Sequence, residues 1–382
     1  MLKESKKTRE NNRSAALAAI VPVAIVGKIV ALFILPEKYF YDNNRMVSML
    51  TGGNLDSWGG YQSTVDIFAK INFFNFTTMT EWSLALGAVG TVILLIMVSK
   101  VKEMSISEVF YTLMAAGLLN IYVFNIGKEP VQMTYFLCAL IVIMLPFDNN
   151  TLKVIGCALV FYWESNTFRS YYILMAVMCI GFWIVFSVFR RIVKKMTGFK
   201  IVLAIVMCAA AMLALVFMTQ FVDKKSYNEV MDAKFSHTNE GASTDISNWI
   251  GDENDSGNYG NFSVNYVING IRMMFPIELL VKSPGYFPFV IYQIFLLVYW
   301  IRAIKNIKTI NNHGFLALIC FTSYIFGSFT FEPDFGSWVR HEAASFPVFY
   351  VLAFEDLCEK NEEELETPME VTYETENIQY TD

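Results

Sequence analysis

Charged side chains that could carry chemistry gather at five places in an otherwise apolar chain. Arginine stays charged and binds phosphate oxygens through a planar fork, and a neighbouring carboxylate or imidazole can take a proton from a hydroxyl. Such groups suit the anionic headgroup of a lipid-linked molecule in the outer leaflet of a membrane. The five places are Asp42 with Arg45, Lys128 with Glu129, Glu164 with Arg169, Arg272 alone, and the segment 332–342.

The segment 332–342 is the densest of these places. It contains Glu332, Asp334, Arg340, His341 and Glu342, and His341 is one of only three histidines in the chain. Charges beside membrane spans are costly, which makes them candidates for function. The alternative is a structural ion pair between Arg340 and Glu332 or Glu342.

The composition indicates that membrane helices must position these side chains. Of 382 residues, 55% are hydrophobic and 17% are charged, whereas soluble proteins have roughly 25% charged residues. The apolar runs are continuous, as in 201–218, and do not alternate as the strands of outer-membrane barrels do. We therefore expect an all-α polytopic integral membrane protein.

Ten apolar segments are expected to cross the membrane. Three of them (152–163, 286–301 and 343–357) are shorter than the roughly 17–25 residues that a crossing needs, and they are retained because ten spans put the basic turns on one side. The full set is 16–35, 82–98, 108–124, 131–147, 152–163, 171–189, 201–221, 286–301, 314–331 and 343–357.

The basic residues predict that both termini are cytoplasmic, since short basic loops mark that side of the membrane. The expected organisation is a cytoplasmic N-terminus (1–15), a transmembrane domain (16–357) and an acidic, disordered cytoplasmic tail (358–382). Two outer loops are long: 36–81, and the large loop 222–285 between the seventh and eighth spans.

The large loop contains a further apolar segment, 264–280, with a single arginine, Arg272, and an interruption at Pro276. We expect it to form a helix that lies at the outer interface, where Arg272 meets lipid headgroups, or that re-enters the fold. No metal, nucleotide or other cofactor pattern is present, so we expect no cofactor. The net charge of −6 arises in the acidic C-terminus, and without a basic patch we expect no nucleic-acid partner.

Three short segments resemble parts of Wzy-like polysaccharide polymerases, the O-antigen and capsule repeat-unit polymerases of bacterial envelopes. They are 127–132 (GKEPVQ), 168–174 (FRSYYIL) and 337–347 (SWVRHEAASFP). The layout of about ten spans, a large outer loop late in the chain and outward arginines is also similar to that family.

The resemblance implies a reaction at the outer face of the bacterial cytoplasmic membrane. A growing glycan would move from a polyprenyl diphosphate carrier to a second lipid-linked repeat unit. It implies that Arg169 and Arg340 hold the diphosphate, with Lys128 and Arg272 assisting. The candidate bases are Asp334, Glu332, His341 and Glu164, and Asp42 with Arg45 is a secondary site. The implied partners are the lipid-linked oligosaccharide, membrane lipid, a chain-length regulator and a flippase.

Two other functions remain open from the sequence. A membrane glycosyltransferase that uses polyprenyl-phosphate sugars would place acidic residues in its first outer loop, where Asp42 lies without a close acidic neighbour. A lipid-linked oligosaccharide flippase, which is not an enzyme, would need charges in the middle of several spans. An O-acyltransferase is a further option without a clear histidine motif.

Overall fold

The computed structural model describes residues 5–53, 60–167, 170–225, 227–228, 230–231, 244–246, 248–251 and 258–358. The regular secondary structure of this part of the chain is helical, apart from one antiparallel bridge between Asp245 and Asp334. The all-α class expected from the composition is therefore confirmed for the described residues. The predicted acidic tail after Cys358 lies outside them.

Seven helices in the described part are long and apolar enough to cross a membrane, as expected of a polytopic membrane protein. Two of them end in a π-helical turn, at Val30–Ile34 (η1) and Leu119–Val123 (η3). The seven are α1 (Lys6–Ile29) with η1, α4 (Met79–Ser99), α5 (Ile106–Leu118) with η3, α8 (Tyr172–Ile192), α9 (Gly198–Val222), α13 (Phe287–Lys305) with the preceding turn Pro284–Tyr286 (η5), and α14 (Asn312–Phe331).

The other three predicted spans are also helical. The segment 131–147 lies mostly in α6 (Lys128–Met144), and 152–163 lies in α7 (Asn150–Thr167). α7 is longer than predicted because its helix continues through the polar residues 164–167. The last predicted span, 343–357, is divided among α15 (Phe335–Ala344), α16 (Phe346–Ala353) and α17 (Glu355–Cys358).

The two predicted outer loops contain shorter helices. The first holds the turn Glu37–Phe40 (η2), α2 (Tyr41–Leu50) and α3 (Tyr61–Ile71). The predicted helix 264–280 is two helices, α11 (Tyr259–Met274) and α12 (Glu278–Lys282), which are separated at Pro276 because proline cannot donate a backbone hydrogen bond.

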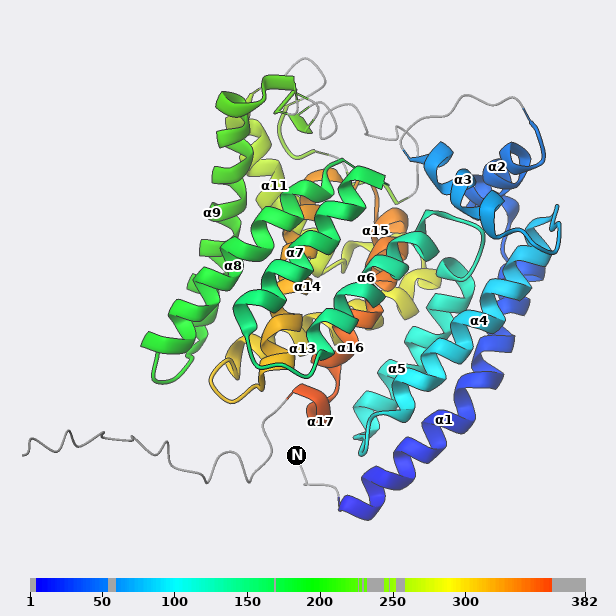
Figure 1. The fold of residues 1–382 in the computed structure, drawn as a ribbon, viewed down its shortest axis with the longest axis horizontal. Helices are drawn as coiled ribbons and strands as arrows, with labels where there is room; N and C mark the ends of the chain where they lie inside the picture. Colours follow the sequence, from blue (N-terminus) through cyan, green and yellow to red (C-terminus); the bar gives the residue numbers. More distant parts are fainter. Residues whose placement is uncertain are drawn as a thin grey trace, which may run out of the picture.

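Helix α14 forms the centre of the bundle. Every residue from Gly314 to Thr330 is buried, and α6, α8 and α16 pack around it. The ribbon shows α9 at one flank of the molecule, and α1 with α4 at the other (Figure 1).

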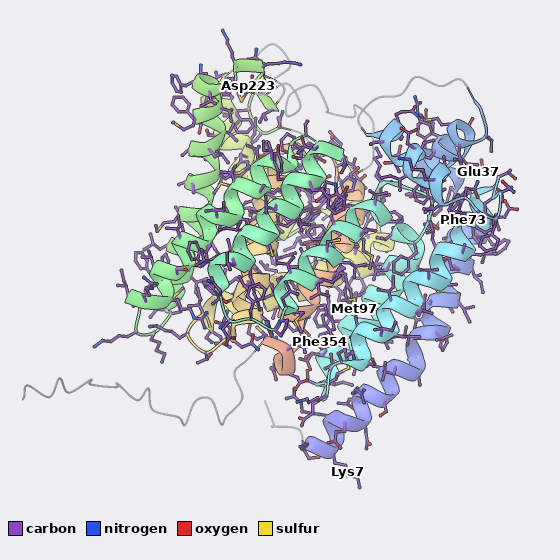
Figure 2. All side chains as sticks on the ribbon, viewed as in Figure 1. Lys7, Glu37, Phe73, Met97, Asp223 and Phe354 are labelled. Atoms are coloured by element: carbon purple, nitrogen blue, oxygen red, sulfur yellow. The ribbon has the colours of Figure 1, made fainter. Side chains whose placement is uncertain are left out.

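The chain's two described ends meet at one end of the bundle. The Arg9 guanidinium lies 3.1 Å from the Glu355 carboxylate, which also pairs with Arg302 at 3.1 Å. The backbone N–H of Lys102 donates to the Asp356 carboxylate at 2.8 Å. Figure 2 places the labelled Lys7 and Phe354 toward this end, with Glu37, Phe73 and Asp223 toward the opposite end.

Helices α2, α3 and α15 lie toward that opposite end (Figure 1). There the segment 244–246 runs against 333–335: Phe335 N–H donates to Thr244 O at 2.9 Å and Ile246 N–H donates to Pro333 O at 3.0 Å. These bonds fix the start of α15, whose indole at Trp338 is fully buried and donates to Met273 O of α11 at 3.1 Å. Helix α15 is therefore held rigidly where its polar residues reach a cavity.

Candidate functional site

A cavity of about 1300 Å³ opens among α2, α6, α8, α9 and α15. Six of the ten residues to which the sequence analysis gave a site role line it, although they come from three distant parts of the chain. They are Asp42, Lys128, Glu332, Asp334, Arg340 and His341.

The polar end of the cavity is a network of cations and carboxylates. The Arg340 guanidinium lies 3.9 Å from the Asp42 carboxylate and 3.7 Å from that of Glu129. The Lys128 ammonium lies 3.8 Å from the same Asp42 oxygen. In the described part of the chain, Arg340 therefore pairs with Asp42 and Glu129, rather than with Glu332 or Glu342 as the sequence alternative supposed.

Asp42 is the carboxylate shared by both cations. The Tyr61 hydroxyl donates to it at 2.5 Å, and the Lys128 ammonium lies 3.8 Å from the centre of the Tyr61 ring. Burial raises the pKa of Asp42, but Lys128, Arg340 and the Tyr61 hydrogen bond outweigh it and lower the pKa below its usual value. Asp42 is therefore an anion at neutral pH and offsets part of the positive charge of Lys128 and Arg340.

His341 is placed between two carboxylates. Its Nδ1 lies 2.8 Å from Glu332 Oε1, and its Nε2 lies 3.9 Å from Glu129 Oε1. A carboxylate that accepts from one ring nitrogen orients the imidazole and favours proton uptake at the other. The arrangement can therefore accept a proton from a hydroxyl bound in the cavity.

Asp334 has a local structural role. Its carboxylate accepts from Ser337 N–H at 2.9 Å and from the Ser337 hydroxyl at 3.0 Å, which caps the first turn of α15. The cap sets the direction in which α15 presents Arg340 and His341.

The loop before Lys128 and Glu129 is held by two buried side chains. The Lys28 ammonium donates to Phe124 O at 2.5 Å, Asn125 Oδ1 at 3.1 Å and Ser83 Oγ at 3.1 Å. The Asn43 amide donates to Ile126 O at 2.5 Å. The bonds to Phe124 O and Ile126 O satisfy backbone carbonyl groups that have no helical partner after the π-helical turn η3 ends.

Gly127 lies directly against the polar ends of two neighbouring side chains. A Cβ atom there would lie 2.5 Å from the Glu129 carboxylate and 3.1 Å from the Asn43 amide. Glycine therefore lets the first residues of α6 turn their charges toward α2 and α15.

The remaining predicted site residues lie elsewhere. Glu164 is buried on α7 and Arg45 lies 5.4 Å from the Tyr61 ring, and neither lines the cavity. Arg272 pairs with Glu278 at 2.8 Å beside a second, smaller pocket. Arg169 lies outside the described residues.

Sequence reasoning missed Tyr61 and Lys38, which both line the cavity. Neither carries a signal in the sequence, because each lies in an unremarkable stretch of the first predicted outer loop.

Among the described residues, no group of three or more His, Cys, Asp or Glu side chains could hold a metal ion.

The cavity continues from its charged end into apolar walls. One wall comes from α1 with η1 and from α5 with η3, and the other comes from α8 and α9. The apolar lining residues on these helices include Val30, Leu118, Ile121, Val177, Leu215 and Met218. A cavity of this shape matches an amphiphile with an anionic head and an apolar tail.

No protein-family model, no curated protein and no solved structure matches this chain.

Proposed function

We propose that the protein polymerises lipid-linked oligosaccharide repeat units by glycosyl transfer. The observation that supports this most directly is that Arg340 and Lys128 line one end of the large cavity, while apolar residues of four membrane helices line its walls. The charged end suits the diphosphate of a polyprenyl carrier, and the apolar walls suit its isoprenoid chain.

In this proposal, Arg340 and Lys128 bind the diphosphate and stabilise the charge that develops as it leaves. The bond between the anomeric carbon and the diphosphate oxygen breaks while a hydroxyl of the second repeat unit forms the new glycosidic bond. The hydroxyl proton passes to His341, which Glu332 orients. Among the candidate bases His341 is preferred, because Asp334 caps a helix and Glu164 does not line the cavity.

We place this reaction at the outer face of the bacterial cytoplasmic membrane. The contact between Arg9 and Glu355 places both described ends of the chain at the same end of the bundle, which requires an even number of crossings. Seven apolar helices with α6, α7 and the pair α15–α16 would make ten. The basic turns lie at the same end of the bundle as both described chain ends. The positive-inside rule therefore assigns this end of the bundle to the cytoplasm and the cavity to the outer side.

The test is the length of the surface glycan in a deletion strain that expresses single variants. Arg340→Ala should abolish polymer while single repeat units still reach the surface. Arg302→Ala is the matched control, because Arg302 is equally buried but pairs with Glu355 at the other end. Both variants are compared at equal membrane abundance.

Other outcomes separate the alternative functions. Loss of repeat-unit export in the deletion strain would indicate a flippase, and a repeat unit that lacks one sugar would indicate a glycosyltransferase. Normal polymer from Arg340→Ala would contradict the proposal.

A further inference from the structure

A second pocket, of about 310 Å³, lies apart from the large cavity. It is lined by one aromatic ring, two aliphatic side chains and three polar groups: Trp249, Ile268, Ile271, Asn248, Arg272 and Glu278. The polar groups all have planar ends, and none of these six residues lines the large cavity.

Trp249 presents its indole to solvent although the backbone that carries it is fixed. The side chain is 70% exposed. The fully buried Asn265 accepts from Trp249 N–H at 2.8 Å and from Ile250 N–H at 3.1 Å, and donates to Ile250 O at 2.7 Å. The exposed ring therefore rests on a fixed backbone and lines a pocket together with Ile268 and Ile271, which makes this surface a candidate for binding a ligand.

The polar groups of this pocket are also ordered before any ligand binds. Arg272 donates to both Glu278 oxygens, at 3.1 Å through Nε and at 2.8 Å through Nη2. Arg272 also donates to Asn269 Oδ1 at 3.0 Å, and the Asn269 amide reaches Asn248 Oδ1 at 3.5 Å. The result is a row of planar donors and acceptors beside the indole.

This combination fits a sugar better than an anionic lipid headgroup. The C–H groups of a sugar ring stack on the electron-rich face of an indole, and its hydroxyls bond to carboxylate and amide groups. An anion would have to displace a carboxylate that Arg272 holds through two short hydrogen bonds, unlike Arg340, whose ion pairs are 3.7–3.9 Å long. Here Glu278 neutralises Arg272 with a forked pair and keeps 36% of its own side chain exposed.

The pocket is within short reach of the large cavity. Thr244 lines the cavity and Asn248 lines the pocket, and the two residues are four positions apart in the sequence. Four residues span at most about 14 Å. The indole is therefore near enough to the cavity for a glycan on a carrier there to reach it.

We propose that the pocket formed by Asn248, Trp249, Arg272 and Glu278 is a carbohydrate-binding subsite. Trp249 stacks against one sugar ring, while Glu278 and Asn248 bond to its hydroxyls. That the bound sugar belongs to the glycan carried into the large cavity rests on the proposed function. That the pocket binds a sugar does not.

The test measures sugar binding by the full-length protein in lipid nanodiscs. The probes are neutral mono- and disaccharides and the oligosaccharides released from the host cell's own envelope polysaccharide. Magnetisation transfer from protein to sugar ring protons reports weak binding. We expect transfer to at least one probe, and about tenfold weaker binding by Trp249→Ala, the loss that one aromatic stacking contact typically produces. Glu278→Gln should weaken the same binding.

Trp163→Ala is the matched control, because Trp163 is another exposed tryptophan, 54% exposed, on α7. It should leave sugar binding unchanged. The subsite is overturned if no probe binds, or if Trp249→Ala binds as the wild type does. It is also overturned if brominated lipids quench Trp249 and no sugar protects it, since the ring would then be a membrane anchor.

The two proposals fail separately. If Arg340→Ala leaves the polymer normal while Trp249→Ala loses sugar binding, the proposed function is wrong and the subsite stands. If Arg340→Ala loses polymer while Trp249→Ala binds sugars normally, the subsite is wrong and the proposed function stands.

Discussion

At the scale of single residues, the shape of the Arg340 side chain matters as well as its charge. Its guanidinium lies 3.7–3.9 Å from two carboxylates, and a lysine could maintain such long ion pairs. Only arginine can place two parallel donors on a diphosphate. We therefore expect Arg340→Lys to lose about 10²–10³ in polymerisation rate, the typical effect of removing a donor to a developing anion.

This prediction is measured as glycan chain length at matched membrane abundance, with Arg302→Lys as the control. Normal chain length in Arg340→Lys would assign Arg340 to a structural ion pair. A lower membrane abundance of Arg340→Lys without a shorter glycan would also indicate a structural ion pair.

Asp42 competes with any anion for the same two cations. Its carboxylate lies 3.8 Å from the Lys128 ammonium and 3.9 Å from the Arg340 guanidinium. Replacing it by a neutral amide should strengthen binding of inorganic pyrophosphate about fivefold, which corresponds to ~1 kcal/mol for a partly exposed pair. Calorimetry on Asp42→Asn tests this, with Asp66→Asn as the control, because Asp66 bonds to Gln62 on the exposed face of α3. Weaker binding by Asp42→Asn would contradict it.

The same carboxylate gives a pH dependence of definite sign. Because the pKa of Asp42 is lowered in the folded protein, its contribution to stability is present above the usual aspartate range. It is lost as the pH falls through the folded-state pKa. The wild type should therefore lose more stability than Asp42→Asn when the pH falls from about 5 to 3, the range around the ordinary aspartate pKa. Thermal unfolding in detergent measures this, and equal losses would contradict it.

At the scale of helices, the Lys28 contact controls where α6 begins. A Cβ atom on Gly87 of α4 would lie 2.3 Å from Lys28 Cε, so Gly87→Ala should displace the ammonium from Phe124 O. An unsatisfied buried carbonyl costs ~1–3 kcal/mol, and the loop that leads to Lys128 would lose its support. We expect a lower unfolding temperature and a shorter glycan.

Gly117→Ala on α5 is the matched control for this prediction. A Cβ atom there would meet only Val23 Cγ1, at an ordinary 3.7 Å, so stability should change little. Equal unfolding temperatures for the two variants would show that Lys28 does not hold this loop.

The helices could be predicted from the sequence more readily than their ends and partners. The long apolar runs predict their helices because each run is a local property of the chain. The extension of α7 through Glu164 to Thr167 was missed, because polar residues end an apolar run without ending the helix. The contact between Tyr61 and Asp42 depends on how α2 and α3 fold together. The pairing of Arg272 with Glu278 depends on the turn at Pro276. No residue spacing encodes either contact.

At the scale of the whole molecule, the network around Glu355 predicts the topology. Glu355 joins Arg9 and Arg302, and Arg190 donates to Ile310 O at 2.9 Å. These contacts bring the N-terminus, the turn before α14 and the end of α8 to one end of the bundle. Since their basic residues favour the cytoplasm, the exposed Thr309 should be cytoplasmic and the exposed Gln62 of α3 should be external.

Single cysteines test this in a variant whose six native cysteines are replaced. An impermeant thiol reagent should label Gln62→Cys in intact cells and Thr309→Cys only after the membrane is opened. The cysteine-free variant without an added cysteine gives the baseline. Ten crossings require opposite sides for these two positions, since both chain ends share one side with Thr309. Labelling of Thr309→Cys in intact cells would place the basic turns outside, and the cavity of Arg340 would then face the cytoplasm.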